Sequence, residues 1–417
     1  MRLPKSALHT LSETKYISDF QLPPCQEATK EPTDSKRTER LTTTTKIIRR
    51  IEEISPDEWY QIFPNVLEGY HFFKSLEESN FEQFSFYYIL IYNQETLIGA
   101  TSCFSMNYPL DTTVQGPLKQ ITTAVKKTFP NLLNLKALIC GLPMGQGRIG
   151  MREEYAQQTI GSIVECIEQI AKEEKVSVIA FKDFGLTYTN AMDQLLKQGF
   201  HKIESLPSTD MEIKFDDFNQ YLKTLSRVSR DGLKRKFKKI DGRIKIDLEI
   251  SNALTDTVLD EAYALYLQTV SRSEVQFETV PKEFFVRVAK NMPNQTKYFL
   301  WRIENKLVAF AFCLFSEDLF IDYYLGFDYS VAYDLHLYFV RFRDLMNWCI
   351  ENKIKKYEMG NTSYEPKRRL GFNFIPLYIY AKHRNRWFNP LFKLLCTFLK
   401  PENYDSIFKD MKKKESR

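Results

Sequence analysis

A short polar segment carries the densest group of side chains able to do chemistry. It comprises Tyr364, Glu365, Lys367, Arg368 and Arg369, directly after an apolar, strand-like run. A carboxylate such as Glu365 could accept a proton, and the three cations could pair with phosphate or carboxylate. The structural alternative is an exposed loop held by ion pairs. We expect Tyr364 and Glu365 to serve catalysis and the cations to hold an anionic part of a ligand.

A second group of candidates precedes this segment in the chain. Asp322 stands in an otherwise apolar run, where a carboxylate must be paired or functional because burying it alone is costly. Tyr323 or Tyr324 could supply a proton, and strand alternation predicts that the two point to opposite faces of a sheet. His336 could be a base or have a structural role. We count Asp322, Tyr324 and His336 among the catalytic candidates.

The loop 325–334 leads into a helix expected to begin near Leu335. Free N–H groups at a helix start can hold an anion, so Tyr333, Asp334 and Leu335 are predicted to contact one. Asp334 could instead cap the helix and satisfy these groups itself. The loop lacks the glycines of a well-formed pyrophosphate cradle, which leaves room for a different kind of activated donor.

Residues 145–150 read Gly-Gln-Gly-Arg-Ile-Gly, a phosphate-turn pattern that is expected to precede a helix. A dinucleotide site would also need an acid at the end of the next strand, whereas Glu173 and Glu174 end a helix. A dinucleotide fold is therefore disfavoured. Two interpretations remain: backbone N–H contact with a phosphate, or glycines that only make a tight turn.

The elements that must position these groups occur twice. A hairpin predicted over residues 87–104 returns over residues 298–314, each time with a polar turn. An amphipathic helix, a strand and a Gly-Phe pair follow each hairpin. They occupy residues 155–174, 176–181 and 199–200 in the first copy, and 335–352, 354–359 and 371–372 in the second. Two copies of one α/β fold, each a mixed sheet flanked by helices, are the predicted architecture.

Length and composition agree with this. A chain of 417 residues, 43% hydrophobic and 27% charged, is typical of a globular protein of more than one domain. The seven cysteines are scattered singly without a CxxC pair, which predicts buried, reduced thiols and neither a disulfide framework nor a zinc site. No run reaches the ~20 apolar residues of a membrane span. We expect a cytoplasmic protein with no metal, preceded by a disordered tail over residues 1–45.

Two basic segments are candidates for binding a polyanion. Residues 226–245 hold nine Lys or Arg against two Asp, and residues 382–417 hold ten against four acids. The first is predicted to be an amphipathic helix. Its apolar face would comprise Leu222, Leu225, Val228, Leu233 and Phe237. A solvated face is the commonest meaning of such runs, but both could bind transfer RNA or an anionic membrane surface.

The order of hairpin, helix, strand and trailing Gly-Phe resembles the GNAT acyltransferase fold, and its tandem repetition resembles the Fem-type transferases. Residues 360–371, with a glycine turn leading to Glu-x-Lys and then Gly, are similar to a signature of that family. Residues 140–147 are similar to the glycine turn that ends its N-terminal sheet segment. The resemblance covers residues 47–385. It implies direct attack of an amine on an acyl-CoA thioester, with no permanently bound cofactor.

These observations predict four segments. They are a tail (1–45), an N-terminal GNAT-like domain (46–215), a catalytic C-terminal GNAT-like domain (216–385) and a basic amphipathic extension (386–417). The expected activity is acyl transfer from acyl-CoA to an unknown amine. One alternative is a Fem-type transferase that uses aminoacyl-tRNA. The other is a catalytically silent scaffold that binds a membrane or a partner protein.

Overall fold

The computed structural model describes residues 43–109, 134–273, 277–397, 401 and 407–408. The predicted tail, Cys25 and most of the C-terminal extension lie outside these residues. The six cysteines within them are buried and free, as expected. None of the helices in the described part of the chain has the length and apolar character needed to cross a bilayer.

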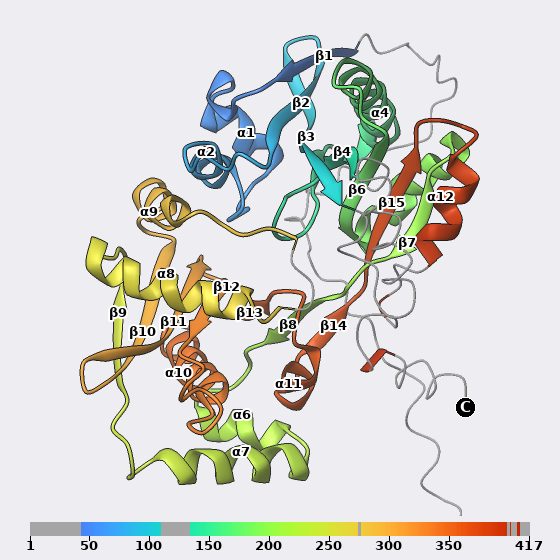
Figure 1. The fold of residues 1–417 in the computed structure, drawn as a ribbon. Helices are drawn as coiled ribbons and strands as arrows, with labels where there is room; N and C mark the ends of the chain where they lie inside the picture. Colours follow the sequence, from blue (N-terminus) through green and yellow to red (C-terminus); the bar gives the residue numbers. More distant parts are fainter. Residues whose placement is uncertain (1–42, 110–133, 274–276, 398–400, 402–406, 409–417) are drawn as a thin grey trace, which may run out of the picture. The chain divides into compact units, whose positions relative to one another are not determined.

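The strands form two mixed sheets (Figure 1). Within the described residues the first sheet contains, in spatial order, β1 (Thr43–Ile48), β2 (Ser85–Asn93), β3 (Thr96–Pro109), β4 (Asn134–Cys140), β6 (Val178–Gly185), β15 (Leu377–His383) and β7 (His201–Glu204), with β5 (Ile149–Met151) paired to β3. The second contains β14 (Asn373–Ile375), β8 (Ser208–Glu212), β13 (Lys356–Met359), β12 (Leu319–Phe327), β11 (Lys306–Phe315), β10 (Thr296–Ile303) and β9 (Asp247–Ser251). Both predicted hairpins, β2–β3 and β10–β11, are confirmed.

The two halves of the chain exchange strands. β15, near the end of the chain, inserts between β6 and β7 of the first sheet. β8, from the first half, inserts between β13 and β14 of the second sheet. The predicted boundary at residue 215 therefore does not separate the two sheets, because each sheet includes a strand from the other side of this boundary.

Helices cover the sheets. They are α1 (Pro56–Ile62), α2 (Tyr70–Glu77), α4 (Ala156–Glu173), α5 (Thr189–Met192), α6 (Phe218–Thr224), α7 (Arg227–Ile240), α8 (Asp256–Val270), α9 (Lys282–Asn291), α10 (Leu337–Glu351), α11 (Tyr364–Arg369) and α12 (Asn389–Cys396). The equivalent crossover helices α4 and α10 each share a buried apolar cluster with their own sheet. Their positions confirm the two predicted helices and the duplicated α/β architecture.

The two Gly-Phe pairs have the same structural role. Gly199 and Gly371 have φ of 83° and 80°, the left-handed conformation that glycine adopts without a Cβ clash after a helical turn. The following residues, Phe200 and Phe372, are buried in the cores of the first and second sheets. The late Gly-Phe pair is therefore a shared device for ending a helical turn and anchoring the next strand.

The basic helix is shorter than predicted. Ser226 caps α7 by accepting from the N–H of Ser229, so Leu222 belongs to the preceding helix α6. Leu233 and Phe237 are buried as expected, but Val228 is 85% exposed. The prediction of a single apolar face is therefore wrong at Val228. The chain leaves the helical conformation between α6 and α7, so the helical spacing does not continue from Leu222 to Val228.

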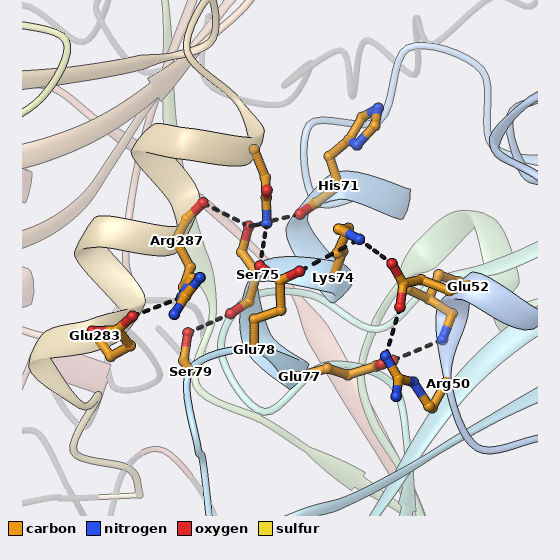
Figure 2. A network of polar contacts seen from close by, with 12 residues as sticks. Arg50, Glu52, His71, Lys74, Ser75, Glu77, Glu78, Ser79, Glu283 and Arg287 are labelled. Atoms are coloured by element: carbon orange, nitrogen blue, oxygen red, sulfur yellow. Dashed lines mark hydrogen bonds and ion pairs between the residues drawn. The ribbon is translucent and has the colours of Figure 1, made fainter.

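A polar contact between α2 and α9 joins the halves away from the strand ends (Figure 2). The hydroxyl of Ser75 donates to the carbonyl oxygen of His71 at 2.8 Å or to that of Arg287 at 3.3 Å. It accepts from the amide of Asn291 at 3.1 Å. The same amide also lies 3.1 Å from a carboxylate oxygen of Glu78. Together with the strand exchange, this contact fixes the two sheets against one another.

Candidate functional site

A cavity of about 540 Å³ lies where strands of both sheets end. In the first sheet the parallel pair β4–β6 ends at Cys140 and Phe181, and in the second the parallel pair β12–β13 ends at Asp322 and Met359. Beyond these pairs, residues of all four strands or of the turns that follow them line the cavity. Sites at the carboxyl ends of diverging strands are typical of α/β proteins.

Lys367 is the most unusual group in the cavity wall. It lies on α11, its residue is only 3% exposed, and its ammonium donates to the carbonyl oxygen of Gly360. The described residues provide it with no ion-pair partner. Burial lowers the pKa of Lys367 to about 7, against an attraction to Asp322 that raises it. A lysine that is partly neutral near pH 7 can accept a proton as well as donate one.

Asp322 lies on the same wall but is paired. Its two carboxylate oxygens accept from Nη1 of Arg341 at 2.7 and 2.6 Å, and one of them also accepts from the hydroxyl of Tyr357 at 3.0 Å. Asp322 and Arg341 are almost completely buried. Of the two roles predicted for Asp322, the geometry supports the paired one. Asp322 also affects the site because its negative charge raises the pKa of Lys367.

Tyr323 and Tyr324 both line the cavity, so the prediction that they point to opposite faces is wrong. The pairing of β11 with β12 shifts register between Phe312 and Cys313, which face Tyr324 and Asp322 and leave Tyr323 as the extra residue. Such a bulge interrupts the alternation of side chains along a strand. Tyr324 donates to Glu278 at 3.1 Å, and burial raises the pKa values of both groups.

Glu68 connects the two halves across the cavity. Its carboxylate accepts from Nη2 of Arg148 at 2.8 Å and from the hydroxyl of Tyr323 at 3.0 Å. Glu68 is buried and its charge is paired with that of Arg148, although Nε of Arg148 has no hydrogen-bond partner among the described residues. The first-sheet side of the cavity therefore presents a closed ion pair.

The glycine turn 145–150 is a packing device. A Cβ on Gly145, which has a φ of 92°, would lie 2.4 Å from Glu68, and a Cβ on Gly147 would lie 2.2 Å from the carbonyl oxygen of Lys182. The short strand β5 begins within this segment, at Ile149, and α4 starts six residues after Gly150. The helix expected after this segment is confirmed, because α4 begins at Ala156, and the tight-turn interpretation accounts for these glycines.

Several predicted residues lie outside the cavity wall. Glu365 is bound to Arg368 and Arg369, at 2.9 and 2.7 Å, on the exposed side of α11. Tyr364 is buried and donates to the carbonyl oxygens of Pro207 or Asn361. The structure thus separates the predicted cluster: Lys367 faces inward, and the other members face outward or pack in the core.

The residues expected to hold an anion, Tyr333, Asp334 and Leu335, directly precede α10 and are followed by His336, which lies near cations of α7. Tyr333 is 72% exposed, Asp334 is exposed and Leu335 is half-buried. Burial and then the charges of Lys236 and Lys239 lower the pKa of His336, the first residue before α10. Burial and then repulsion from neighbours that include Arg369 lower the pKa of Lys236. Cations of α7 and α11 therefore gather beside the start of α10; we call Lys236, Lys239, His336 and Arg369 the basic patch.

Among the groups in or beside the cavity that the sequence interpretation missed are Glu68, Glu278, Tyr338 and Arg341. Arg341 could have been found, because it lies four residues from both Leu337 and Leu345 and so shares the buried stripe of α10. The hydroxyl of Tyr338 is buried without a hydrogen-bond partner among the described residues, although Tyr338 lines the cavity. Glu68 and Glu278 lie within irregular segments, where periodicity carries no signal.

Comparison with solved structures supports the fold. FemX is similar over 84% of this chain and 100% of its own, with 13% identity and a TM-score of 0.54. L-PGS from Bacillus licheniformis (12% identity, 72% and 86% coverage, TM-score 0.47) and a tandem GNAT protein from the clavulanic acid biosynthesis pathway (7%, 82% and 98%, 0.48) are weaker matches. The likeness to FemX shows a shared fold, and no more than that.

Sequence comparison adds a curated relative and a family. The putative 8-amino-7-oxononanoate synthase 2 of Mycobacterium tuberculosis is 21% identical over 332 residues, which are 76% of this chain. The chain spans only 42% of the length of that protein. Residues 50–413 match the FemAB-like family, described as peptidoglycan biosynthesis or recognition. The predicted resemblance and the expectation of a transferase are thereby confirmed, and the chain belongs to the FemAB-like family.

Proposed function

We propose that the protein transfers an acyl group from an acyl-CoA thioester to an amine bound in the cavity, with Lys367 as the proton acceptor. The observation that carries this proposal is the position of Lys367: a buried cavity-wall amine with a pKa of about 7 and no acidic partner among the described residues. Perturbed, unpaired titratable groups in a cavity are typical of catalytic sites.

The reaction assigns one task to each group. The acceptor nitrogen attacks the thioester carbonyl carbon, the C–N bond forms, and the C–S bond breaks. Lys367 takes the proton released by the nitrogen and can return it to the departing thiolate. The unpartnered hydroxyl of Tyr338 is the candidate donor to the carbonyl oxygen as its negative charge develops. Burial raises the pKa of Tyr338, which keeps it protonated and able to donate.

The basic patch is the proposed site for the phosphates of coenzyme A. Its cations repel each other in the free protein, and an anion would relieve that repulsion. The short helix α11 carries Arg369 on its exposed side and Lys367 on its buried side. A donor could therefore rest its phosphates on the patch and direct its thioester into the cavity.

Aminoacyl-tRNA is the second candidate donor, and α7 is the observation that favours it. Exposed cations continue along this helix beyond the patch, at Arg227, Lys234, Arg235 and Lys238. This is more positive charge than one coenzyme A needs. A polynucleotide that contacted most of them would show a steep loss of affinity with added salt.

Calorimetric titration distinguishes the donors. We expect coenzyme A to bind the wild-type protein, and Lys236→Glu or Arg369→Glu to weaken binding roughly tenfold or more, because each reversal removes a charge-assisted contact. Lys46→Glu on the exposed β1 strand is the matched control. Bound phosphate should also raise the pKa of His336, measured by NMR.

The outcomes separate the three interpretations. Binding of coenzyme A followed by acyl transfer supports the proposal. Binding of aminoacyl-tRNA alone, with strong salt dependence, would replace the acyl-CoA donor by the Fem-type one. A protein that binds either ligand without ever consuming it would be the silent scaffold, and that result would contradict the proposed activity.

A further inference from the structure

The cavity has two unlike ends, and strand β6 runs from one to the other. Val178 and Ala180 face the cavity near the start of the strand, and Lys182 faces it near the end. The edge strand β7 shows the same change from apolar to polar lining: Ile203 lies on the strand, and Ser205 directly follows its last residue. The polar end holds Lys367 and the acids described above. The opposite end is a second compartment with its own chemistry.

This second compartment, which we call the apolar arm, is walled by one face of the first sheet and by α12. Its lining includes Ala137, Ile139, Ala180, Ala381, Phe392 and Cys396. The register places Ala180 directly between Ile139 of β4 and Ala381 of β15. Alternation sends Leu138 and Ile179 to the other face, where they pack in the cluster that contains α4.

The side chains of the arm leave space and offer no hydrogen bonds. Three alanines on adjacent strands make a shallow wall, whereas the opposite face of the same strands is filled by larger residues. An apolar compartment holds water poorly, because water there would lack polar partners. The group that fits is elongated and apolar, and it must be joined to a polar portion that reaches the charged end.

We infer that the apolar arm binds a long alkyl chain of a substrate, with its reactive head at Lys367. The position of the reactive head rests on the proposed function. The position of the alkyl chain rests only on the lining of the apolar arm. The chain could belong to a long-chain acyl donor or to a lipid acceptor, since both present the same hydrocarbon. The helix α12 covers the arm with Phe392 and Cys396, while Trp387, Leu391 and Leu394 are exposed on and beside it.

Displacement of the fluorescent fatty acid cis-parinaric acid measures chain binding directly. Competing octanoate, decanoate and dodecanoate should bind progressively more tightly, by about fourfold for each added CH₂, which is the increment for burying a methylene. Affinities that do not change with chain length would overturn the inference. Lys367→Met should keep the same increment per CH₂, so this measurement of the arm does not depend on catalysis.

Substitutions in the arm locate the site. Ala180→Leu should shorten the preferred chain and weaken dodecanoate binding at least tenfold, while Ala191→Leu, at a half-buried position outside the cavity, should change neither. Equal binding by the two variants would overturn the assignment. If Ala180→Leu does not fold, protection of Cys396 from a thiol reagent by dodecanoate in the wild-type protein tests the same contact, and a lack of protection contradicts it.

Two further ligands identify the source of the chain. Tighter binding of palmitoyl-CoA than of acetyl-CoA, lost in Ala180→Leu, assigns the chain to the donor. Binding to phosphatidylethanolamine vesicles that depends on Ala180 assigns it to a lipid acceptor. Turnover of acetyl-CoA without any chain binding would overturn this inference and leave the proposed function intact. Chain binding without turnover of any thioester would support this inference and contradict the proposed function.

Discussion

The two sheets end at the cavity in the same way, but the charged residues that follow their strands are paired differently. In each, a parallel strand pair diverges at the cavity and is followed by a turn. After β4, the glycine turn brings Arg148 to Glu68, and the charges are paired. After β13, α11 buries Lys367, whose ammonium donates to a carbonyl oxygen and has no acidic partner among the described residues. Both copies keep the same strand arrangement, but only the second turn buries a cation without an acidic partner among the described residues; under the proposed function, that copy carries the chemistry.

The largest effect should come from removing the unpaired charge. The pKa of Lys367 is lowered from 10.5 to about 7, so between these values the unfolded chain binds one proton more than the folded protein, and stability rises with pH. Below pH 7 the folded protein carries the full cost of the buried charge. Lys367→Met should therefore be more stable than wild type at pH 6, with an advantage that falls by about 1.4 kcal/mol per pH unit above pH 7.

Urea denaturation of both proteins at pH 6, 7, 8 and 9 measures this difference. Lys382→Met serves as a control, because Lys382 is paired with Glu168 outside the cavity and its removal should give no such pH dependence. A Lys367→Met protein that is less stable than wild type at pH 6 would show that the lysine is paired, and the contrast between the two sheets would fail.

The next largest effects on stability should come from neutralising the paired acids beside the two sheets, Asp322 and Glu68. Asp322→Asn leaves Arg341 buried without its counter-charge and should cost about 3–5 kcal/mol of unfolding free energy. Glu68→Gln should cost less, because Arg148 is partly exposed and can be hydrated. Thermal unfolding of the two variants ranks them. A larger loss for Glu68→Gln would reverse the assigned order.

A smaller effect is expected at the hydroxyl that joins the halves. Tyr323→Phe removes the hydrogen bond to Glu68 and leaves a buried acceptor less satisfied, which should cost about 1–3 kcal/mol. Tyr60→Phe, a tyrosine outside the cavity wall, provides a comparison for loss of a hydroxyl. Equal unfolding midpoints for the wild type and Tyr323→Phe would show that this bond contributes nothing.

The smallest change in stability is expected from substitutions in the two Gly-Phe turns. Gly199→Ala and Gly371→Ala each place a Cβ at positive φ, which should cost roughly 1 kcal/mol. Gly371→Ala should cost slightly more, because its Cβ would lie 3.0 Å from Leu225, against 3.6 Å from Asn389 for Gly199. Parallel denaturant titrations of the two variants test this. A negligible cost in both would remove the shared role of the two turns.

The duplicated hairpins, the helices α4 and α10 and the Gly-Phe turns were predictable, because periodicity and turn chemistry are local. The exchange of β8 and β15 was not, since strand partners far apart in sequence leave no local pattern. At the site, the segment 364–369 contributes Lys367 to the cavity wall, but composition cannot tell which of its cations faces inward. The bulge at Tyr323 likewise depends on pairing with β11, so alternation failed there.

The dependence of acyl transfer on pH tests the central claim most directly. With Lys367 as proton acceptor, kcat/KM of the wild-type protein should rise about tenfold per pH unit below about pH 7 and then level off. Lys367→Met should lose at least ~100-fold in kcat/KM and show no such rise, while remaining folded. A Lys367→Met protein with wild-type turnover and the same pH profile would contradict the account.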